Sequence, residues 1–272
     1  MLKECLDNVR TGNPLIHNMT NYVTVNDVAN VLLACGGAPI MAQEIKEVED
    51  IQTICGGLCI NIGTLGMTEA MILAGKKANE LGHPVVLDPV GVGASRERKE
   101  TVERLMKEVH FTVIRGNISE IKAIAMDTNT TRGVDAAEAD AVNAENIESV
   151  IGLAKKLAAA HDTVIAITGA TDIVADSEKA WIISNGHPIM SSITGSGCML
   201  SAVIAAYVTA NPGNAPEAAA AAVISEGYAG ELAEAITSSR SEGNASFRTH
   251  LIDEMYKMNG EALERGAKYE IR

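Results

Sequence analysis

The chain has 272 residues, of which 47% are hydrophobic, and its 22 basic and 35 acidic residues give a formal net charge of −13. This length and apolar content are enough for one large α/β domain or two small ones. The acidic balance excludes the basic footprint that a nucleic-acid or anionic-membrane surface requires, so an anionic substrate would need a local positive site.

The first two thirds of the chain alternate predicted helices with short apolar strands. Helices are predicted over residues 27–34, 44–55, 67–81, 96–109, 118–126 and 144–160, with a polar loop over 127–135. Strands are predicted over residues 38–41, 58–62, 84–88, 111–115 and 163–168. Short apolar strands separated by longer helices indicate right-handed crossovers and a mostly parallel sheet that is covered on both faces.

After residue 168 the predicted strands follow one another closely, which is typical of an antiparallel edge. They cover residues 172–175 and 179–184, and the turn signal Asn185-Gly186 separates them from a further strand-like stretch at 189–192. From Cys198 onward the pattern is helical, with an Ala-rich span over 215–236 and a terminal helix from about Phe247. The composition shows no linker and no repeat, so we expect a single domain over residues 1–272.

Residues 194–198, Thr-Gly-Ser-Gly-Cys, directly precede the apolar helical run that begins at Met199. A helix that opens with glycines and small polar residues presents unpaired backbone N–H groups and a positive dipole end, which stabilise a phosphate charge. Cys198 lies at this position, where the dipole favours its thiolate over the thiol. The alternative is a Gly-rich turn with a buried, inert cysteine, and the segment alone fits both interpretations.

Further polar or Gly-rich segments follow the predicted strands, at the edge where ligands bind in an open parallel sheet. They are residues 61–64, 88–93, 115–120 and 168–169. Arg115 offers a forked cation for phosphate oxygens, while Asp88 and Glu120 are hard carboxylates suited to Mg²⁺. Phosphoryl transfer also needs a group that accepts or positions the proton of an attacking hydroxyl, and Cys198 is the candidate. Each charged residue also has a structural alternative: a solvated cation for Arg115, an N-cap for Asp88 and a surface ion pair for Glu120.

Several common signatures are missing. The chain has no G-x-x-x-x-G-K-[ST], and neither Gly91-x-Gly93 nor Gly195-x-Gly197 completes G-x-G-x-x-G, which disfavours P-loop and Rossmann nucleotide sites. The six histidines lack metal-ligand spacing, and the five cysteines form an odd set without a Cys-x-x-Cys pair, as is typical of reduced thiols. Because no membrane span or signal peptide is found, we expect a cytoplasmic protein without membrane or nucleic-acid partners.

A series of short motifs in a specific order covers nearly the whole chain. They are residues 14–21, 26–30, 37–42, 61–64, 87–91, 114–117, 166–169 and 194–198. In order and spacing the sequence resembles the hydroxyethylthiazole kinases of the ribokinase-like superfamily. The resemblance implies an α/β fold, a ribokinase-like three-layer sandwich with a mostly parallel central sheet, helices on both faces and an antiparallel edge. It also implies ATP-dependent, Mg²⁺-assisted phosphorylation of the hydroxyl of 4-methyl-5-(2-hydroxyethyl)thiazole in thiamine salvage.

The resemblance also assigns roles to residues of the matching motifs. Cys198 is the expected catalytic residue, and the anion hole consists of Gly195, Ser196 and Gly197. ATP contacts are expected from Arg115, Asn117, Thr168 and Gly169. Thiazole contacts are expected from Asn26, Met41 and Gly195, and metal contacts from Asp88 and Glu120. Members of the family form trimers with active sites at subunit interfaces, so we expect a homotrimer in which Asn26 and Met41 serve a neighbour's site.

Other functions remain open at this point. Related sugar and vitamin kinases place an aspartate where this chain has Cys198. A cysteine with a pKa near about 8.5 is mostly protonated at neutral pH, so Cys198 is expected to position the hydroxyl more than to deprotonate it. The alternatives are a hydroxymethylpyrimidine kinase, a pyridoxal kinase or the dehydratase that repairs hydrated NAD(P)H. A non-catalytic binding protein is the least favoured, because the anion-hole glycines and Cys198 are intact.

Overall fold

The computed structural model describes residues 1–127, 142 and 145–272. Its strands are β1 (Leu15–Met19), β2 (Ala38–Ile40), β3 (Gly57–Asn61), β4 (Val85–Asp88), β5 (Val113–Asn117), β6 (Val164–Thr168), β7 (Asp172–Ala175), β8 (Ala180–Ile183) and β9 (Tyr269–Ile271). In this part of the chain they form one nine-stranded sheet in the order β2-β1-β3-β4-β5-β6-β7-β8-β9.

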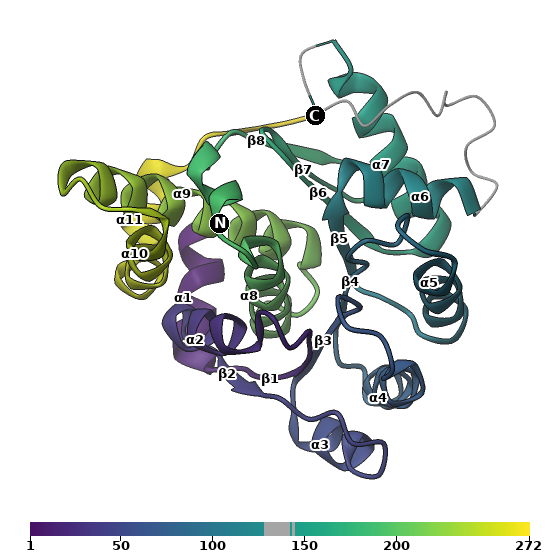
Figure 1. The fold of residues 1–272 in the computed structure, drawn as a ribbon. Coiled ribbons are helices and arrows are strands. Elements are labelled where there is room, and N and C mark those ends of the chain that lie inside the picture. The colour runs from purple at the N-terminus through teal and green to yellow at the C-terminus, as the bar shows by residue number, and fades with distance from the viewer. Residues whose placement is uncertain (128–141, 143–144) are drawn as a thin grey trace.

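The sheet is parallel from β2 to β6 and antiparallel from β6 to β9. The parallel strands are joined by crossovers that contain helices, whereas β6, β7 and β8 follow one another through short turns (Figure 1). The predicted mostly parallel sheet with an antiparallel edge is therefore confirmed.

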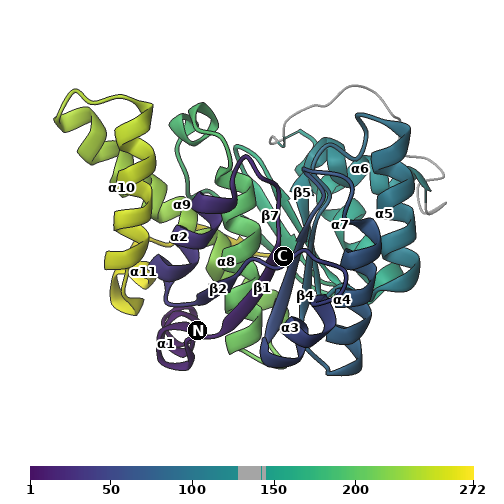
Figure 2. The same cartoon turned by 60° about the horizontal axis from the view of Figure 1, so that its bottom comes forward.

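Helices cover both faces of the sheet. They are α1 (Leu2–Gly12), α2 (Val25–Cys35), α3 (Val48–Ile54), α4 (Thr68–Glu80), α5 (Arg96–Glu108), α6 (Ile118–Asp127), α7 (Ile147–His161), α8 (Ser196–Ala210), α9 (Ala215–Ser239), α10 (Asn244–Lys257) and α11 (Gly260–Gly266). Helices α3 to α7 lie on one side, and α1, α2, α8 and α9 lie on the other (Figures 1 and 2). Helix α10 packs outside α9 and α2, and α11 packs against α1. These layers confirm the predicted three-layer sandwich.

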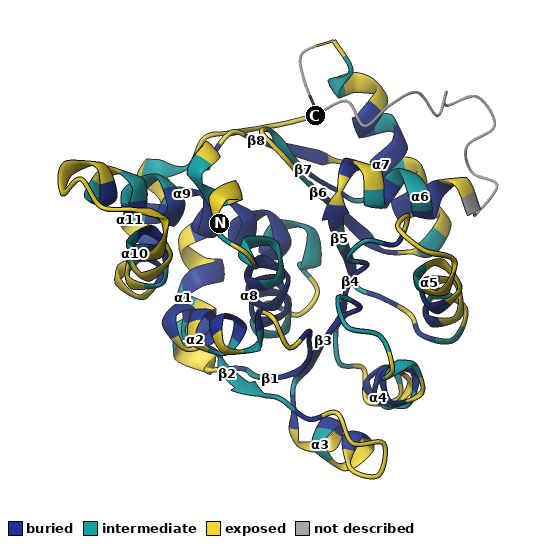
Figure 3. Ribbon diagram, viewed as in Figure 1, coloured by how far each residue is buried: buried dark blue, intermediate teal, exposed yellow. Residues whose placement is uncertain are grey.

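Alternating strand residues supply two apolar cores, one on each face of the sheet. In β4, Val86 belongs to the core under α8 and α9, while Val85 and Leu87 belong to the core under α4 to α7. Burial on both faces explains why the central strands read as continuous apolar runs (Figure 3). Helix α8 packs across β1, β3 and β4, which places its first residues at the carboxyl edge of these strands.

Strand β1 was not expected, because polar residues interrupt its apolar pattern. His17 and Asn18 are nevertheless fully buried. The His17 ring nitrogens lie 3.2 Å from Gln52 Oε1 and 3.0 Å from the carbonyl oxygen of Ala42, and Asn18 Nδ2 donates to the carbonyl of Ile16. These partners satisfy the His17 ring and the Asn18 Nδ2 group, while Asn18 Oδ1 has no partner among the described residues. Helices α1 and α11 and the exposed strand β9 were not expected either.

Two predicted elements differ from the structure. The stretch 189–192 is not a strand but the 3₁₀ helix η1 (Pro188–Ser192), in which His187 Nδ1 accepts from the amide of Ile189. The sheet position beside β8 is taken instead by β9 from the end of the chain. The helix expected over 44–55 begins only at Val48, after a turn. The expected loop over 127–135 and the helix start at 144 lie outside the described residues, apart from Asp127, which ends α6.

The Ala-rich span is helix α9, and Ala218–Ala222 are all buried. Small side chains let α9 lie close to α8, α10 and the sheet, as expected for tightly packed helices. Among the described helices, none combines the length and apolarity that a bilayer crossing needs.

Candidate active site

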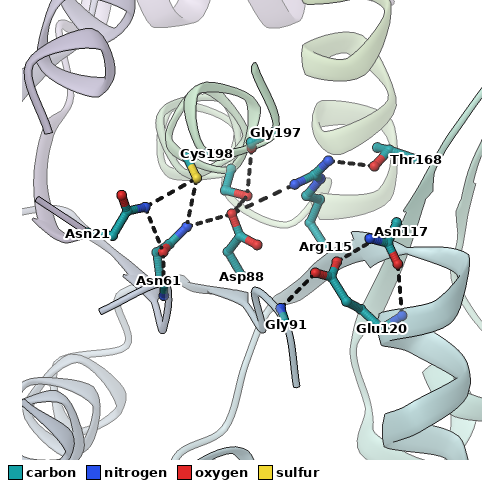
Figure 4. Close-up of polar contacts among 12 residues, drawn as sticks. Asn21, Asn61, Asp88, Gly91, Arg115, Asn117, Glu120, Thr168, Gly197 and Cys198 are labelled. Atoms are coloured by element: carbon teal, nitrogen blue, oxygen red, sulfur yellow. Dashed lines mark hydrogen bonds and ion pairs between the residues drawn. The ribbon is translucent and has the colours of Figure 1, made fainter. Parts of the chain in front are cut away.

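The candidate residues come together where the carboxyl ends of β3, β4, β5 and β6 meet the first turn of α8 (Figure 4). Asp88 ends β4, Thr168 ends β6, and Arg115 is the middle residue of β5. Cys198 projects from α8 toward them. Segments that are separated by more than half of the sequence therefore form one polar cluster, as the strand ends of a parallel sheet allow.

Asp88 is fully buried at the centre of this cluster. Its Oδ2 accepts hydrogen bonds of 2.8 Å from Asn61 Nδ2 and from Ser201 Oγ, and it lies 3.7 Å from Arg115 Nη1. Its Oδ1 has no hydrogen-bond partner within the described part of the chain. Burial raises the pKa of Asp88 to about 6, although Arg115 and the hydrogen bonds oppose the change. Asp88 is thus no N-cap but a buried carboxylate with one free oxygen.

Cys198 lies in the first turn of α8, one helical turn before Ser201. Its sulfur accepts from the side-chain amides of Asn21 and Asn61, each at 3.3 Å. Burial raises the pKa of the Cys198 thiol, and the neighbouring Asp88 carboxylate raises it further. The expectation that the helix end favours a thiolate is therefore wrong, because desolvation and a nearby negative charge outweigh the dipole. At neutral pH the group is a thiol.

Arg115 is held in place against the start of α8. Its Nη2 donates to Thr168 Oγ1 at 2.5 Å. A Cβ atom on Gly197 would overlap the guanidinium group, so only glycine allows this close approach. Gly195 has a positive φ of 88°, and a Cβ atom there would lie 2.6 Å from Thr24 Cγ2. A side chain at Gly197 would therefore displace the Arg115 guanidinium, and one at Gly195 would also be strained by the positive φ.

Glu120 connects the loops that follow β4 and β5. Its Oε1 accepts from the amide of Gly91 at 2.9 Å, and its Oε2 accepts from the amide of Asn117 at 2.8 Å. Asn117 Oδ1 in turn accepts from the amide of Glu120, which caps the start of α6. In the described structure, backbone amides rather than the surface ion pair considered above occupy both Glu120 oxygens.

A cavity of about 430 Å³ adjoins this cluster. One end is polar and is formed by Arg115, Thr168, Gly169, Ser196 and Gly197. Asp172 also lines the cavity and accepts a hydrogen bond of 2.8 Å from the amide of Gly169. Burial raises the pKa of Asp172 to about 7. Most of the residues predicted to bind ATP therefore face one cavity.

Two predicted thiazole residues are not joined to this cluster by any hydrogen bond in the described structure. Asn26 is exposed on α2, where its side-chain oxygen accepts from Asn30 Nδ2. Met41 follows the edge strand β2 and packs, half-buried, on the core under α8. Gly195, the third, lies beside Thr24 at the start of α2.

Asn21, Asn61 and Ser201 hold the cluster together, and no role is predicted for them from the sequence. Asn61 belongs to the segment 61–64 and Asn21 to the motif 14–21, but their local sequence does not distinguish them from ordinary loop residues. Ser201 follows Cys198 by three residues, so helical periodicity alone places both on one face of α8. That spacing is the signal that could have identified it.

Comparison with known proteins gives consistent matches over the full length. The model of the "HK: Hydroxyethylthiazole kinase family" matches residues 6–261. A hydroxyethylthiazole kinase of Clostridium acetobutylicum is 56% identical, and the alignment covers 99% of this chain and 99% of that protein. A hydroxyethylthiazole kinase of Clostridium tetani is 48% identical, and the alignment covers 96% of this chain and 94% of that protein. The structure of a hydroxyethylthiazole kinase protein from Pyrococcus horikoshii OT3 has a TM-score of 0.88 at 33% identity, with coverage of 100% and 98%. A pyridoxal kinase from Staphylococcus aureus, in complex with AMP-PCP, has a TM-score of 0.55 at 15% identity, with coverage of 77% and 84%, and shares the fold.

Proposed function

Because the chain belongs to the hydroxyethylthiazole kinase family, we propose that it transfers the terminal phosphoryl group of ATP to the hydroxyl of 4-methyl-5-(2-hydroxyethyl)thiazole. The product is the thiazole phosphate that thiamine phosphate synthesis uses. The observation that carries this proposal is the meeting of Cys198, Asp88 and Arg115 at the start of α8, beside a cavity large enough for a nucleotide.

The start of α8 is the proposed anion hole. The first amide bonded within this helix is that of Met199, which donates to the carbonyl of Gly195. The amides of Ser196, Gly197 and Cys198 precede it and point out of the helix end, where they stabilise the charge of the transferring phosphoryl group. Glycine at 195 and 197 supports this role, because the backbone can approach the phosphate without side chains between them.

Arg115, Thr168, Gly169 and Asn117 are the proposed contacts of the ATP phosphates. Arg115 brings the positive charge that an acidic protein needs locally to bind a polyphosphate. Its bond to Thr168 fixes the guanidinium at the polar end of the cavity. The N–H groups of Arg115 are then already oriented when the phosphate oxygens bind.

Asp88 and Glu120 are the proposed magnesium ligands; each Glu120 oxygen already accepts one backbone amide and would bind the ion through its remaining lone pair. The free, buried Oδ1 of Asp88 is an oxygen ligand that has no other partner in the described structure, and Glu120 is near enough to raise the pKa of Asp88. The described residues contain no group of three or more His, Cys, Asp or Glu side chains that could form a closed metal cage. This agrees with Mg²⁺, which uses one or two carboxylates together with water and phosphate oxygens. When bound, Mg²⁺ neutralises the charge of the phosphates.

Cys198 is proposed to orient the attacking hydroxyl. As a thiol whose sulfur accepts from two asparagine amides, it is proposed to donate its S–H to the alcohol, and its position at the proposed anion hole directs that alcohol toward the phosphoryl group. Asn26, Met41 and Gly195 are the proposed thiazole contacts. The exposed Tyr22, Val23 and Leu33 near Asn26 support a homotrimer in which a neighbouring chain completes the thiazole site.

The direct test is ADP release by the purified protein with Mg-ATP, with and without hydroxyethylthiazole, together with mass spectrometry of the product. We expect thiazole-dependent ADP release and a thiazole phosphate. No stimulation by the thiazole would contradict the proposed substrate. Hydroxymethylpyrimidine, pyridoxal and hydrated NADH are then the substrates to test, since the corresponding enzymes share this superfamily.

A further inference from the structure

A second buried acid, Glu226, lines the same cavity as Arg115 and Gly197. It comes from the middle of α9 and is only 2% exposed. Its Oε2 has no hydrogen-bond partner among the described residues. A buried carboxyl oxygen without a partner is costly, so its presence on a cavity wall indicates that a ligand supplies the partner.

Glu231, also on α9, shows the contrast. Its Oε1 accepts from Asn185 Nδ2 and from the amide of Gly186, each at 3.0 Å, and its Oε2 pairs with Lys268 at 2.6 Å. Glu231 thus fastens the loop after β8 to α9 and is a structural residue. Glu226 lies five residues earlier on the same helix, and its Oε2 has no such contact with the described residues.

Part of the lining of this cavity is apolar. Leu200, Val223, Met190 and Pro188 give it apolar sides. A flat nucleobase fits between apolar walls and needs a polar partner only at its edge, whereas a ribose has hydroxyls around its ring. Arg115, Ser196 and Gly197 line the same cavity, so a nucleotide whose phosphates contact them has its base within the same cavity as Glu226.

We propose that Glu226 reads the adenine of the phosphoryl donor, its carboxylic acid donating to a ring nitrogen and accepting from the adjacent amino group. This inference rests on the proposed function, because it takes the donor to be an adenine nucleotide. An uncharged carboxyl group carries one donor and one acceptor side by side, which matches that edge of adenine. An ionised carboxylate has no donor and leaves the ring nitrogen unpaired.

The surroundings of Glu226 support an uncharged state. Burial raises its pKa to about 8; Arg115 on β5 opposes this change, and Asp172 on β7 adds to it. His187 lines the same cavity. At neutral pH most molecules therefore carry the proton that the contact with adenine needs.

Calorimetric binding of ADP and of inorganic tripolyphosphate, without thiazole, tests the inference. We expect Glu226→Leu to weaken ADP binding by about tenfold or more and to leave tripolyphosphate binding unchanged. Glu234→Leu, on α9 but outside the cavity lining, is the matched control and keeps wild-type affinity for both. Equal ADP affinity in Glu226→Leu and wild type would overturn the inference.

The diphosphate of purine riboside, which lacks the amino group, separates the base from the sugar. We expect the wild type to bind it more weakly than ADP and Glu226→Leu to bind the two equally. A Glu226→Leu variant that still prefers ADP over this analogue would show that the carboxyl contacts another part of the nucleotide, and the inference would be wrong.

Glu226→Gln keeps one donor and one acceptor and guards against misfolding of the leucine variant. We expect it to bind ADP nearly as well as the wild type at pH 7. Between pH 7 and 9 the wild type should lose about tenfold in affinity as Glu226 ionises, while Glu226→Gln stays constant. Parallel pH curves contradict the inference. All these measurements are made without thiazole. They therefore test the role of Glu226 even if the protein does not phosphorylate hydroxyethylthiazole.

Discussion

The amide of Asn61 connects the proposed metal ligand with the proposed catalytic cysteine. Its Nδ2 lies 2.8 Å from Asp88 Oδ2 and 3.3 Å from Cys198 Sγ, while its Oδ1 accepts from Asn21 Nδ2 at 3.1 Å. One buried side chain thus fixes the distance between two groups whose charges influence each other. Removal of the Asp88 carboxylate would therefore change the pKa of the Cys198 thiol.

Substitution of Cys198 tests its role. We expect Cys198→Ala to lower kcat by about 10²-fold, because the hydroxyl loses the group that orients it. Cys198→Asp should retain activity, since a carboxylate can accept the hydroxyl proton that a thiol with a raised pKa does not. Steady-state kinetics with saturating ATP measures both. Cys55→Ala, at a free cysteine that ends α3, is the control. Equal turnover of Cys198→Ala and wild type would remove Cys198 from the mechanism.

The raised pKa of Asp88 predicts that kcat/KM falls at acid pH. Its pKa of about 6 means that protonation below this pH removes the charge proposed to hold Mg²⁺, so kcat/KM should fall there at limiting Mg²⁺. The hydrogen bond from Ser201 Oγ lowers this pKa.

Ser201→Ala should therefore move the acid limb of the kcat/KM profile upward by up to about one pH unit. Ser225→Ala, at a buried serine of α9 bonded to Tyr207, is the control and leaves the limb in place. A purely structural role of Ser201 would lower activity equally at all pH values, and an unmoved limb would refute the assignment.

At the scale of single elements, the first turn of α8, which is the proposed anion hole, packs closely against Arg115 at Gly197. Gly197→Ala adds a Cβ atom that overlaps the guanidinium, so Arg115 must leave Thr168. We expect KM for ATP to rise about tenfold, while the free energy of unfolding changes little because alanine favours the helix by up to about 1 kcal/mol.

Gly152→Ala is the matched control, since a Cβ atom on this glycine of α7 meets nothing within 4 Å. It should gain stability from helix propensity without any change in kinetics. Denaturant titration and ATP saturation curves of both variants separate the two effects. An unchanged KM in Gly197→Ala would mean that Arg115 does not need its position against α8.

The elements also show which parts of the structure the sequence reveals. Strands β3 and β4 are apolar runs between helices, and β6 is an apolar run that follows α7, so their pattern predicts them. The polar residues at their ends follow from sheet topology. Strand β1 contains His17, whose burial depends on Gln52 of another element. Such long-range pairing leaves no local signal, and the same holds for the Asn21 and Asn61 contacts of Cys198.

At the scale of the whole molecule, the nine described strands form one sheet with a core on each face. This continuity supports the expected single domain, which stays a prediction together with the trimer and the cytoplasmic location. If the chain unfolds as one unit, the unfavourable burial of its acidic groups lowers the free energy of unfolding of the whole chain. Asp88, Asp172 and Glu226 all have raised pKa values, to about 6, 7 and 8.

Glu226 predicts how stability depends on pH. At pH 4 the carboxyl is largely protonated in both the folded and the unfolded chain, so it contributes no difference. As the pH rises above its ordinary pKa of 4.5, the unfolded chain ionises while the folded chain holds the proton until about pH 8. The unfolded state gains from this, and the free energy of unfolding falls by about 1.4 kcal/mol per pH unit for this group.

Glu226→Gln removes that titration. We therefore expect the stability of the variant relative to wild type to rise between about pH 5 and pH 8, by a few kcal/mol in all, and to level off above pH 8. Denaturant titrations at several pH values measure this, with Glu234→Gln as the control that follows the wild type. A constant difference between Glu226→Gln and wild type at every pH would show that Glu226 is ionised in the folded chain. The same result would leave no proton at Glu226 for a contact with adenine, so stability and nucleotide recognition are tied to one ionisation.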